Sequence, residues 1–462
     1  MSNNNPFQGL TWPQRLTFAA LCLAVVSIVA WWRIGIYACT LLICVSLFKT
    51  IFSSVSSDSV HSGSVSAAAP RVRRPLFFAM LAYWGLYAVS ALVSQNHAEG
   101  WYVAFIKIYL LAFPLLCLIG DTRYLTRSRI AFLFHLLTAT LLLRFAVCLV
   151  ISGIHLIQGT PLRTAMGWEI DPMGLHHNYL ALYINIALAF LYAYWVSDRN
   201  RSETAVPRRG PKQFLPFVAA GVALVAYLLL SASRSGIVAF GLMFIAAMVH
   251  LVFFRHRYKV ALAVVLLSAA LVAGLYIAVP STFARFEALT HWGENYVPDD
   301  RVIAWECGLK ATRGHLLLGH GSGDYRAALV ESFEQRGYRR AIEQGYDSHN
   351  EYIETLMATG IVGLAFLLLM LFLPMALAFR REKRDMQTVL TVIAVATMIF
   401  FEVMLGRQMG TQSIALVYCL LILKSAAPGE MPGHEDTCQV DAPHDDGIGR
   451  QRGFNGAEEE VS

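Results

Sequence analysis

The chain has 462 residues, of which 56% are hydrophobic and only 15% are charged, with a mean hydropathy of +0.52. A soluble protein of this size carries about 25% charged residues, so this composition excludes a soluble globular protein and predicts a membrane protein. The formal net charge of +6 comes largely from short basic loops between apolar runs, and it gives no indication of nucleic-acid binding.

Apolar runs close to the ~20 residues that cross a bilayer recur along most of the chain. The first run follows Arg15, as a signal peptide would, but the bulky "VAWWRIG" after it offers no cleavage site, so we expect a helix there. The predicted class is an all-α polytopic membrane protein with about 12 transmembrane helices. The runs lie at 15–31, 34–53, 75–95, 100–120, 130–151, 178–196, 213–232, 236–254, 259–279, 354–379, 387–405 and 411–425.

Lys and Arg gather in alternate loops between these runs. An excess of Lys and Arg in short loops marks the cytoplasmic side of a membrane protein. The pattern predicts that both termini are cytoplasmic and that residues 152–177 and 280–353 lie outside. The basic loops are Lys49 with "RVRR", "RYLTRSR", "DRNRSETAVPRRGPK", "RHRYK" and "RREKR".

The runs divide the chain into four parts. Residues 1–279 hold transmembrane helices 1–9 with short loops, residues 280–353 form a helical outer loop domain, and residues 354–425 hold helices 10–12. Residues 426–462 are polar and rich in Gly and acidic residues, which predicts a disordered cytoplasmic tail. Of the eight cysteines, only Cys307 falls in the outer loop, so packing rather than an internal disulfide must stabilise that loop.

The outer loop contains three stretches with helical character. In "DDRVIAWECGLKAT", Val302, Trp305 and Leu309 share one face, and Asp299 or Asp300 is the expected N-cap. "SGDYRAALVESFEQRG" and "YRRAIEQG" predict two further helices. Together they predict a small helical cap over the membrane domain. The "GHGSG" between the first two is expected to be a flexible turn, because a phosphate-binding loop would require a following Lys-Ser/Thr.

Several charged side chains lie within or beside the apolar runs, where a charge costs at least ~2.5–3.5 kcal/mol at mid-bilayer. Most of them fall on the outer side, which predicts a positively charged, water-accessible cavity that binds an anion. The alternative is that each side chain extends its charged group to the nearest interface. The residues concerned are Lys107, Arg144, Arg163, Arg234, Glu402 and Arg407.

The polar run "GYDSHNEY" at residues 345–352 precedes the tenth apolar run. Ser348 and Glu351 have the spacing of a capping box, which predicts a helix start there with His349 at its first position. The positive end of a helix dipole should lower the pKa of His349 and favour its neutral, proton-accepting form. His349 is therefore a candidate general base. A surface histidine in a capping turn is the alternative.

Four short motifs occur in an order that resembles the O-antigen ligase family of Gram-negative inner membranes. They are "SASRSG" from Ser231, the R-x-x-x-W of Arg301 to Trp305, "LLLGHGSGDY" from Leu316, and "SHNEY" from Ser348. The resemblance extends over nearly the whole predicted membrane domain. The family belongs to a broader group with O-antigen polymerases and O-linked protein oligosaccharyltransferases.

The resemblance implies transfer of a polysaccharide from undecaprenyl diphosphate to lipid A-core oligosaccharide at the periplasmic face. It places the essential histidine at His349 and two essential arginines at Arg234 and Arg301. The expected reaction inverts the anomeric carbon, with His349 as base and the arginines binding the diphosphate. The outer loop has no D-x-D, and the pair Asp299 and Asp300 fits helix capping. We therefore expect no metal and no other cofactor.

Further residues are expected to contact substrates. His177 in "HHNY" could line the acceptor site, although a role beside a helix cap is the alternative. Tyr346 and Asp347 adjoin His349 and could orient it. Phosphates of the acceptor would suit basic residues near the outer surface. The last group comprises Arg163, Arg336, Arg339 and Arg340.

Three other functions compete with the ligase. Polymerases tend to carry two substantial outer loops, whereas one dominates here, and protein oligosaccharyltransferases usually extend their C-terminus outside. A polysaccharide-lipid transporter would show internal repeats and charges at the bilayer midplane. The sequence shows no repeat, and its charges fall on the outer half.

Overall fold

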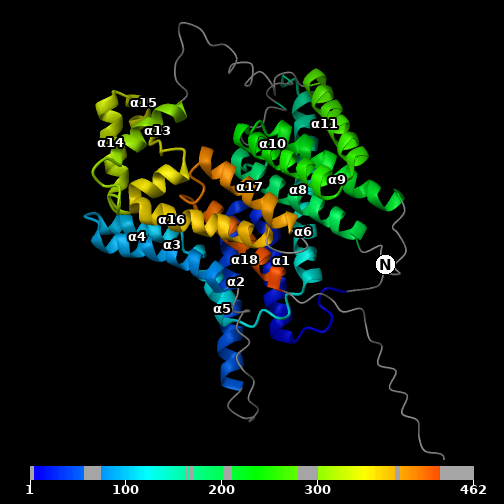
Figure 1. Ribbon diagram of the computed structural model, residues 1–462, viewed down its shortest axis with the longest axis horizontal. Helices are drawn as coiled ribbons and strands as arrows, with labels where there is room; N and C mark the ends of the chain where they lie inside the picture. Colours follow the sequence, from blue (N-terminus) through cyan, green and yellow to red (C-terminus); the bar gives the residue numbers. More distant parts are fainter. Residues whose placement is uncertain are drawn as a thin grey trace, which may run out of the picture. The chain divides into compact units, whose positions relative to one another are not determined.

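The computed structural model of the protein describes residues 5–56, 74–161, 165, 171–200, 211–278, 300–379 and 385–426 (Figure 1). Arg163, Asp299 and the predicted tail beyond residue 426 lie outside these ranges. Within them the fold is helical and contains no β-strand. The helices are α1 (Trp12–Ala30), α2 (Trp32–Ser56), α3 (Arg74–Val93), α4 (His97–Ile106), α5 (Tyr109–Ile119), α6 (Arg127–Ile157), α8 (His177–Asn200), α9 (Pro211–Leu230), α10 (Arg234–Val249) with a π-turn (His250–Phe254), α11 (Tyr258–Ala278), α13 (Asp300–Ala311), α14 (Tyr325–Arg336), α15 (Arg339–Gln344), α16 (Glu351–Phe379), α17 (Met386–Phe401) and α18 (Gln408–Ala426).

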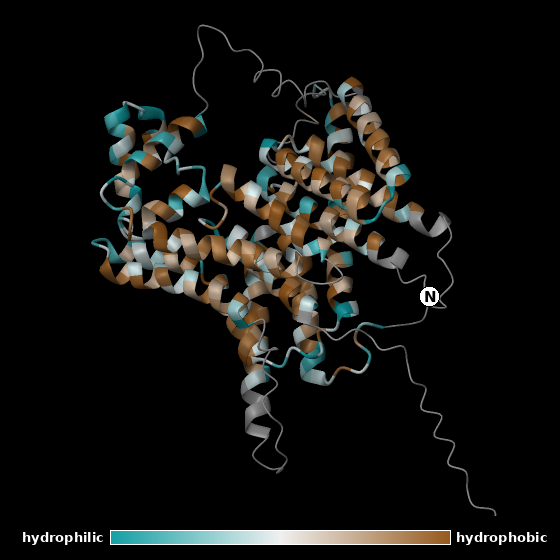
Figure 2. Ribbon diagram, in the orientation of Figure 1, coloured by the Kyte–Doolittle hydropathy of each residue, from teal (hydrophilic) through white to brown (hydrophobic). Residues whose placement is uncertain are grey.

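Seven of the described helices are long and apolar enough to cross a membrane. They are α1, α2, α3, α6, α8, α10 with its π-turn, and α16. The pair α4 and α5, bent by 52°, gives an eighth candidate, and α9, α11 and α17 contain shorter apolar stretches. Figure 2 shows apolar residues along most of these helices and polar residues gathered on α13–α15. The all-helical, multi-pass membrane class is confirmed, whereas twelve spans remain a prediction.

Arg144 of α6 is buried in an ion pair that joins several helices. Its Nε and Nη2 atoms each donate to Asp171 at 2.6 Å, and its Nη1 donates to the carbonyls of Val29 and Ala30 at 2.9 and 2.7 Å. The hydroxyl of Tyr227 donates to the same carboxylate at 3.1 Å. The pair therefore connects α1, α6 and α9 to the segment that enters α8. These contacts favour a structural role for Arg144 over the predicted contact with substrate.

The three predicted loop helices are present as α13, α14 and α15, called the cap helices below, and Figure 1 shows them together beside α3, α4 and α16. Of the predicted apolar face of α13, Trp305 packs against the core, whereas the other two residues do not. Val302 and Leu309 are 45% and 51% exposed, whereas Ala304, Cys307 and Gly308 are buried. The small residues face inward because α13 packs against α14 and α16, and close approach of helices requires small side chains.

Gly360 interrupts α16 with a φ of 67°, and the loop at residues 316–321 fills the break. The N–H of Ile361 donates to the carbonyl of Leu316 at 2.8 Å. In return, the N–H groups of His320 and Gly321 donate to carbonyls of α16 at 2.8 and 3.1 Å. A backbone break within an apolar helix is stable only where protein groups satisfy the freed hydrogen bonds. The loop from the cap helices supplies them here.

The adjoining "GHGSG" turn is packed against α3, so the expectation of a flexible turn is wrong. The N–H of Ser322 is 2.8 Å from the Ser90 hydroxyl, and the carboxylate of Asp324 accepts hydrogen bonds from the backbone N–H groups of Gln95 and Asn96 at 2.7 and 2.9 Å. A side chain at Gly323 would meet the carbonyl of Asn96, since a Cβ there would lie 2.1 Å from that oxygen. These contacts fix the cap helices to the ends of α3 and α4.

We expect Arg144→Ala to lower the free energy of unfolding by about 3–5 kcal/mol, because it leaves Asp171 as an unpaired buried charge. The matched control is Arg336→Ala, which breaks an ion pair with Glu306 whose side chains are 52% and 61% exposed. Such an exposed pair contributes about 0–1 kcal/mol. Thermal unfolding in detergent measures both. An Arg144→Ala protein with normal stability and no transfer activity would instead support the predicted substrate contact.

Candidate active site

The loop between α15 and α16 holds His349 in an uncommon backbone conformation. Its φ is +48°, and its N–H donates to the carboxylate of Asp347 at 2.8 Å. The side chain of Asn350 accepts from the N–H groups of Tyr352 and Ile353 at 2.9 and 3.1 Å, so Asn350 is the N-cap of α16. His349 therefore lies two residues before the helix begins, not at its first position as predicted.

The predicted capping box between Ser348 and Glu351 is also absent. The Ser348 hydroxyl donates to the carbonyl of Asn350 at 3.0 Å and to Glu354 at 3.3 Å. Glu351 is engaged elsewhere, with Lys107. The cap of α16 thus comes from Asn350, whereas Ser348 makes local contacts and Glu351 makes a long-range ion pair.

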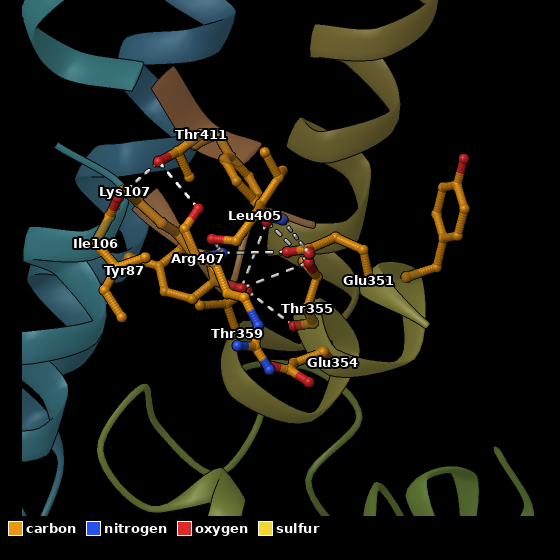
Figure 3. A network of polar contacts seen from close by, with 12 residues as sticks. Tyr87, Ile106, Lys107, Glu351, Glu354, Thr355, Thr359, Leu405, Arg407 and Thr411 are labelled. Carbon is orange, nitrogen blue, oxygen red and sulfur yellow. Dashed lines mark hydrogen bonds and ion pairs between the residues drawn. The ribbon is translucent and has the colours of Figure 1, made fainter. Parts of the chain in front are cut away.

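Lys107 and Glu351 form a buried ion pair with a distance of 3.1 Å (Figure 3). The Nζ of Lys107 also donates to the carbonyl of Leu405 at 2.9 Å, and the N–H of Leu405 donates to Glu351 at 2.8 Å. Three elements meet at this network: the bend between α4 and α5, the start of α16, and the link between α17 and α18. The contacts favour a structural role for Lys107, which was predicted to bind substrate.

Two carboxylates flank the imidazole of His349. Its Nδ1 atom lies 3.4 Å from Asp347 and 3.8 Å from Glu402, distances typical of an ion pair rather than of a short hydrogen bond. The ring of Tyr346 packs edge-on at 5.5 Å between centroids. The structure thus brings the predicted residues Tyr346 and Asp347 to His349. It adds Glu402, a single acidic residue at the end of an apolar helix, which the sequence did not identify as a partner of His349.

The electrostatics of His349 differ from the sequence-based expectation. Burial alone lowers the pKa of His349, but the interaction with Glu402 and the charges of Asp347 and Glu402 outweigh it, so the pKa is raised. Burial alone raises the pKa of Glu402, but the interaction with His349 and the positive charges of His349, His176 and Arg301 outweigh it, so the net shift is downward. The expectation of a lowered histidine pKa is wrong because two nearby carboxylates act more strongly than the end of a helix.

Arg301 and Trp305 lie one turn apart on α13, which explains their R-x-x-x-W spacing. The indole N–H of Trp305 is 3.5 Å from the carbonyl of His349, and its ring lies 5.1 Å from that of Phe400. The positive charge of Arg301 acts on both His349 and Glu402. Trp305 therefore packs α13 against the loop of His349 and against α17, and the charge of Arg301, one turn away on α13, acts on the histidine.

The predicted arginine Arg234 is half-buried and begins α10. The residues on either side of it are fixed: the hydroxyls of Ser233 and Ser235 both donate to the side chain of Asn178, at 2.9 and 3.1 Å. The amide group of Asn178 in turn donates to Glu402 at 2.7 Å. A chain of contacts thus links the turn that carries Arg234 to the carboxylate beside His349.

Other predicted residues lie around this centre. The rings of His176 and His177 are stacked with 4.3 Å between centroids, and the charges of Glu402 and Arg301 act on His177. The charge of Arg407, which is exposed, acts on Asp347. On the cap helices, Arg336 pairs with Glu306 at 3.5 Å, Arg340 pairs with Asp300 at 3.6 Å, and Arg339 is exposed.

Asp347, His349 and Glu402 also have the residue types of a metal site. One candidate ligand atom from each lies within 4.8 Å of the others. One nitrogen and two carboxylate oxygens are a donor set that several divalent metals accept. The opposite pKa shifts of His349 and Glu402 equally describe an imidazolium–carboxylate pair that needs no metal. Chelation distinguishes these two chemistries, and the expectation of a metal-free site stays a prediction.

Comparison with known proteins identifies the region that carries most of this centre. Residues 219–368 match the family model described as O-antigen ligase. A search of curated proteins found no match. The matched region contains Arg234, Arg301 and His349, whereas Asn178 and Glu402 lie outside it. Residues 219–368 of this membrane protein are therefore an O-antigen ligase family domain, and the resemblance stated from the short motifs is confirmed.

Proposed function

We propose that this protein is a glycosyltransferase that moves O-antigen polysaccharide from undecaprenyl diphosphate to lipid A-core oligosaccharide. The observation that carries the proposal is the assembly, in and around the family-matched domain, of His349 with two carboxylates and the charge of Arg301, and the hydrogen-bonded link from this group to the turn of Arg234. Arg301 reaches it through the Trp305 contact, and the turn of Arg234 reaches it through Asn178 and Glu402. A base with one arginine near it and a second on a turn linked to its partner carboxylate suits transfer from a lipid diphosphate.

In the proposed reaction, Nε2 of His349 takes the proton of an acceptor hydroxyl, while Nδ1 faces the carboxylates. The acceptor oxygen forms a bond to the anomeric carbon as the bond from that carbon to the diphosphate oxygen breaks, with inversion. Undecaprenyl diphosphate leaves with the bonding electron pair. Arg234 and Arg301 bind its added negative charge, because guanidinium groups pair bidentately with phosphate and stay protonated. Glu402 stabilises the imidazolium that forms.

We further propose the membrane arrangement that this reaction requires. The polysaccharide donor is used at the periplasmic face of a Gram-negative inner membrane, so residues 280–353 and His349 would be periplasmic and both termini cytoplasmic. The alternating Lys and Arg content of the loops supports this orientation. The exposed basic residues Arg339 and Arg407 would then face the phosphorylated acceptor. Arg163, which lies outside the described residues, stays a predicted contact.

We expect His349→Ala to reduce transfer by about 10²–10⁴-fold, the usual contribution of a general base. The assay uses purified protein, undecaprenyl-diphosphate polysaccharide, lipid A-core and EDTA. His315→Ala, on the exposed loop after α13, is the matched control and should keep wild-type activity.

Full activity of His349→Ala would contradict the base assignment. Loss of wild-type activity in EDTA would instead assign Asp347, His349 and Glu402 to a metal site. Product formed only with a lipid-linked acceptor would indicate a polymerase. In cells, the proposed ligase defect leaves lipid-linked polymer of normal length, whereas a transporter defect would leave repeat units unpolymerised.

The pH dependence of kcat tests the partner of His349. The base acts when neutral, so kcat should rise as pH rises through the pKa of His349. Glu402→Gln removes the carboxylate that raises this pKa, and the rising limb should therefore move to lower pH while the plateau falls. Glu306→Gln, an exposed substitution on α13, should leave the profile unchanged. An unmoved limb in Glu402→Gln would show that Glu402 is not electrostatically coupled to the base.

A further inference from the structure

We propose that Asn178 is a positioning residue that holds the general base and the arginine-bearing turn of α10 in one fixed geometry, an inference that rests on the proposed function. Asn178 is the second residue of α8 and is only 2% exposed. Its Nδ2 donates to Glu402 at 2.7 Å, and its Oδ1 accepts from Ser233 at 2.9 Å and from Ser235 at 3.1 Å.

The chemistry of these partners fixes the orientation of the amide. An ionised carboxylate only accepts hydrogen bonds, so the NH₂ group of Asn178 must face Glu402. The carbonyl oxygen then faces the two serine hydroxyls, which can donate. A flipped amide would direct its oxygen at the carboxylate and lose the bond to Glu402. The side chain of Asn178 therefore joins a carboxylate to two hydroxyls in a way that neither Asp nor Ala can reproduce.

A wider face of α8 holds the same turn of α10. The side chain of Asn185, seven residues along α8, donates to the carbonyl of Gly236 at 3.1 Å. Between them, Ala181 packs so closely that a Cβ on Gly236 would lie 2.3 Å from its own Cβ. Positions 178, 181 and 185 share one helical face. Arg234 thus extends from a turn clamped to α8, and only Asn178 in this clamp also contacts Glu402.

The charged groups around His349 come from several elements. Asp347 belongs to its own loop, Glu402 follows α17, and Arg301 lies on α13; His176 acts on Glu402, and Arg407 acts on Asp347. In contrast to these charged groups, Asn178 is a neutral hydrogen-bond donor to Glu402. Removing such a donor leaves the carboxylate charge less stabilised, so Glu402 should pair more strongly with His349. The expected consequence is a base that is protonated up to higher pH.

The test compares Asn178→Ala with Asn185→Ala, which alters the same face and the same turn but does not touch Glu402. In Asn178→Ala, we expect kcat to fall on the order of a hundredfold, as misplaced catalytic groups typically cause, and the rising limb of the pH profile to move to higher pH. Asn185→Ala should leave that limb in place, whatever its effect on thermal stability. Asn178→Asp should resemble Asn178→Ala near neutral pH, because two carboxylates would then face one another.

An unmoved limb in Asn178→Ala, or equal shifts in both alanine variants, would overturn the positioning role. These outcomes are separable from failure of the proposed function. If wild-type protein transfers polysaccharide and His349→Ala does not, an unaltered Asn178→Ala refutes only the role of Asn178. If His349→Ala retains full transfer, the proposed mechanism itself fails.

Discussion

The geometry of the site depends on one buried ion pair, between Lys107 and Glu351. Each partner would be costly to bury alone, so the pair forces the bend between α4 and α5 to meet the start of α16. Both charges also bond to the backbone of Leu405, which brings in the link that carries Glu402. His349 precedes Glu351 by two residues, and Glu402 precedes Leu405 by three. His349 and Glu402 are therefore anchored to the same point through short chain segments.

The cations of this protein fall into two groups that differ in burial and in their partners. Lys107 and Arg144 are nearly inaccessible, with side-chain exposures of 3% and 2%, and each is matched by a carboxylate and by backbone carbonyls. Arg234 is half-buried and Arg407 is exposed, and the charge of Arg407 acts on Asp347. Buried cations hold helices together, whereas the accessible ones are those available to the anionic substrate proposed above. In the sequence, both groups occur as single charged residues within or beside apolar runs, so the two cannot be told apart there.

The sequence predicts the helical class well, because apolar runs and basic loops are local patterns. It also identifies Arg301 and His349 through motifs, and the structure brings them together. It fails where tertiary contacts outweigh local rules. Asn350 rather than Ser348 caps α16, Ala304 rather than Val302 faces inward on α13, and the pKa of His349 is raised rather than lowered. Asn178 and Glu402 are 224 residues apart, and no local signal could pair them.

The break in α16 at Gly360 separates the short segment that follows His349 from the longer apolar segment of the helix. A continuous transmembrane helix responds to a thicker or thinner membrane by changing its tilt, and residues at its end move with it. Here, the nine residues from Glu351 to Thr359 are held by Lys107 and by the loop that fills the break. The longer segment after Gly360 is joined to these residues through non-helical backbone rather than through a continuous helix. Variation in lipid composition should therefore alter the inclination of this segment without displacing His349.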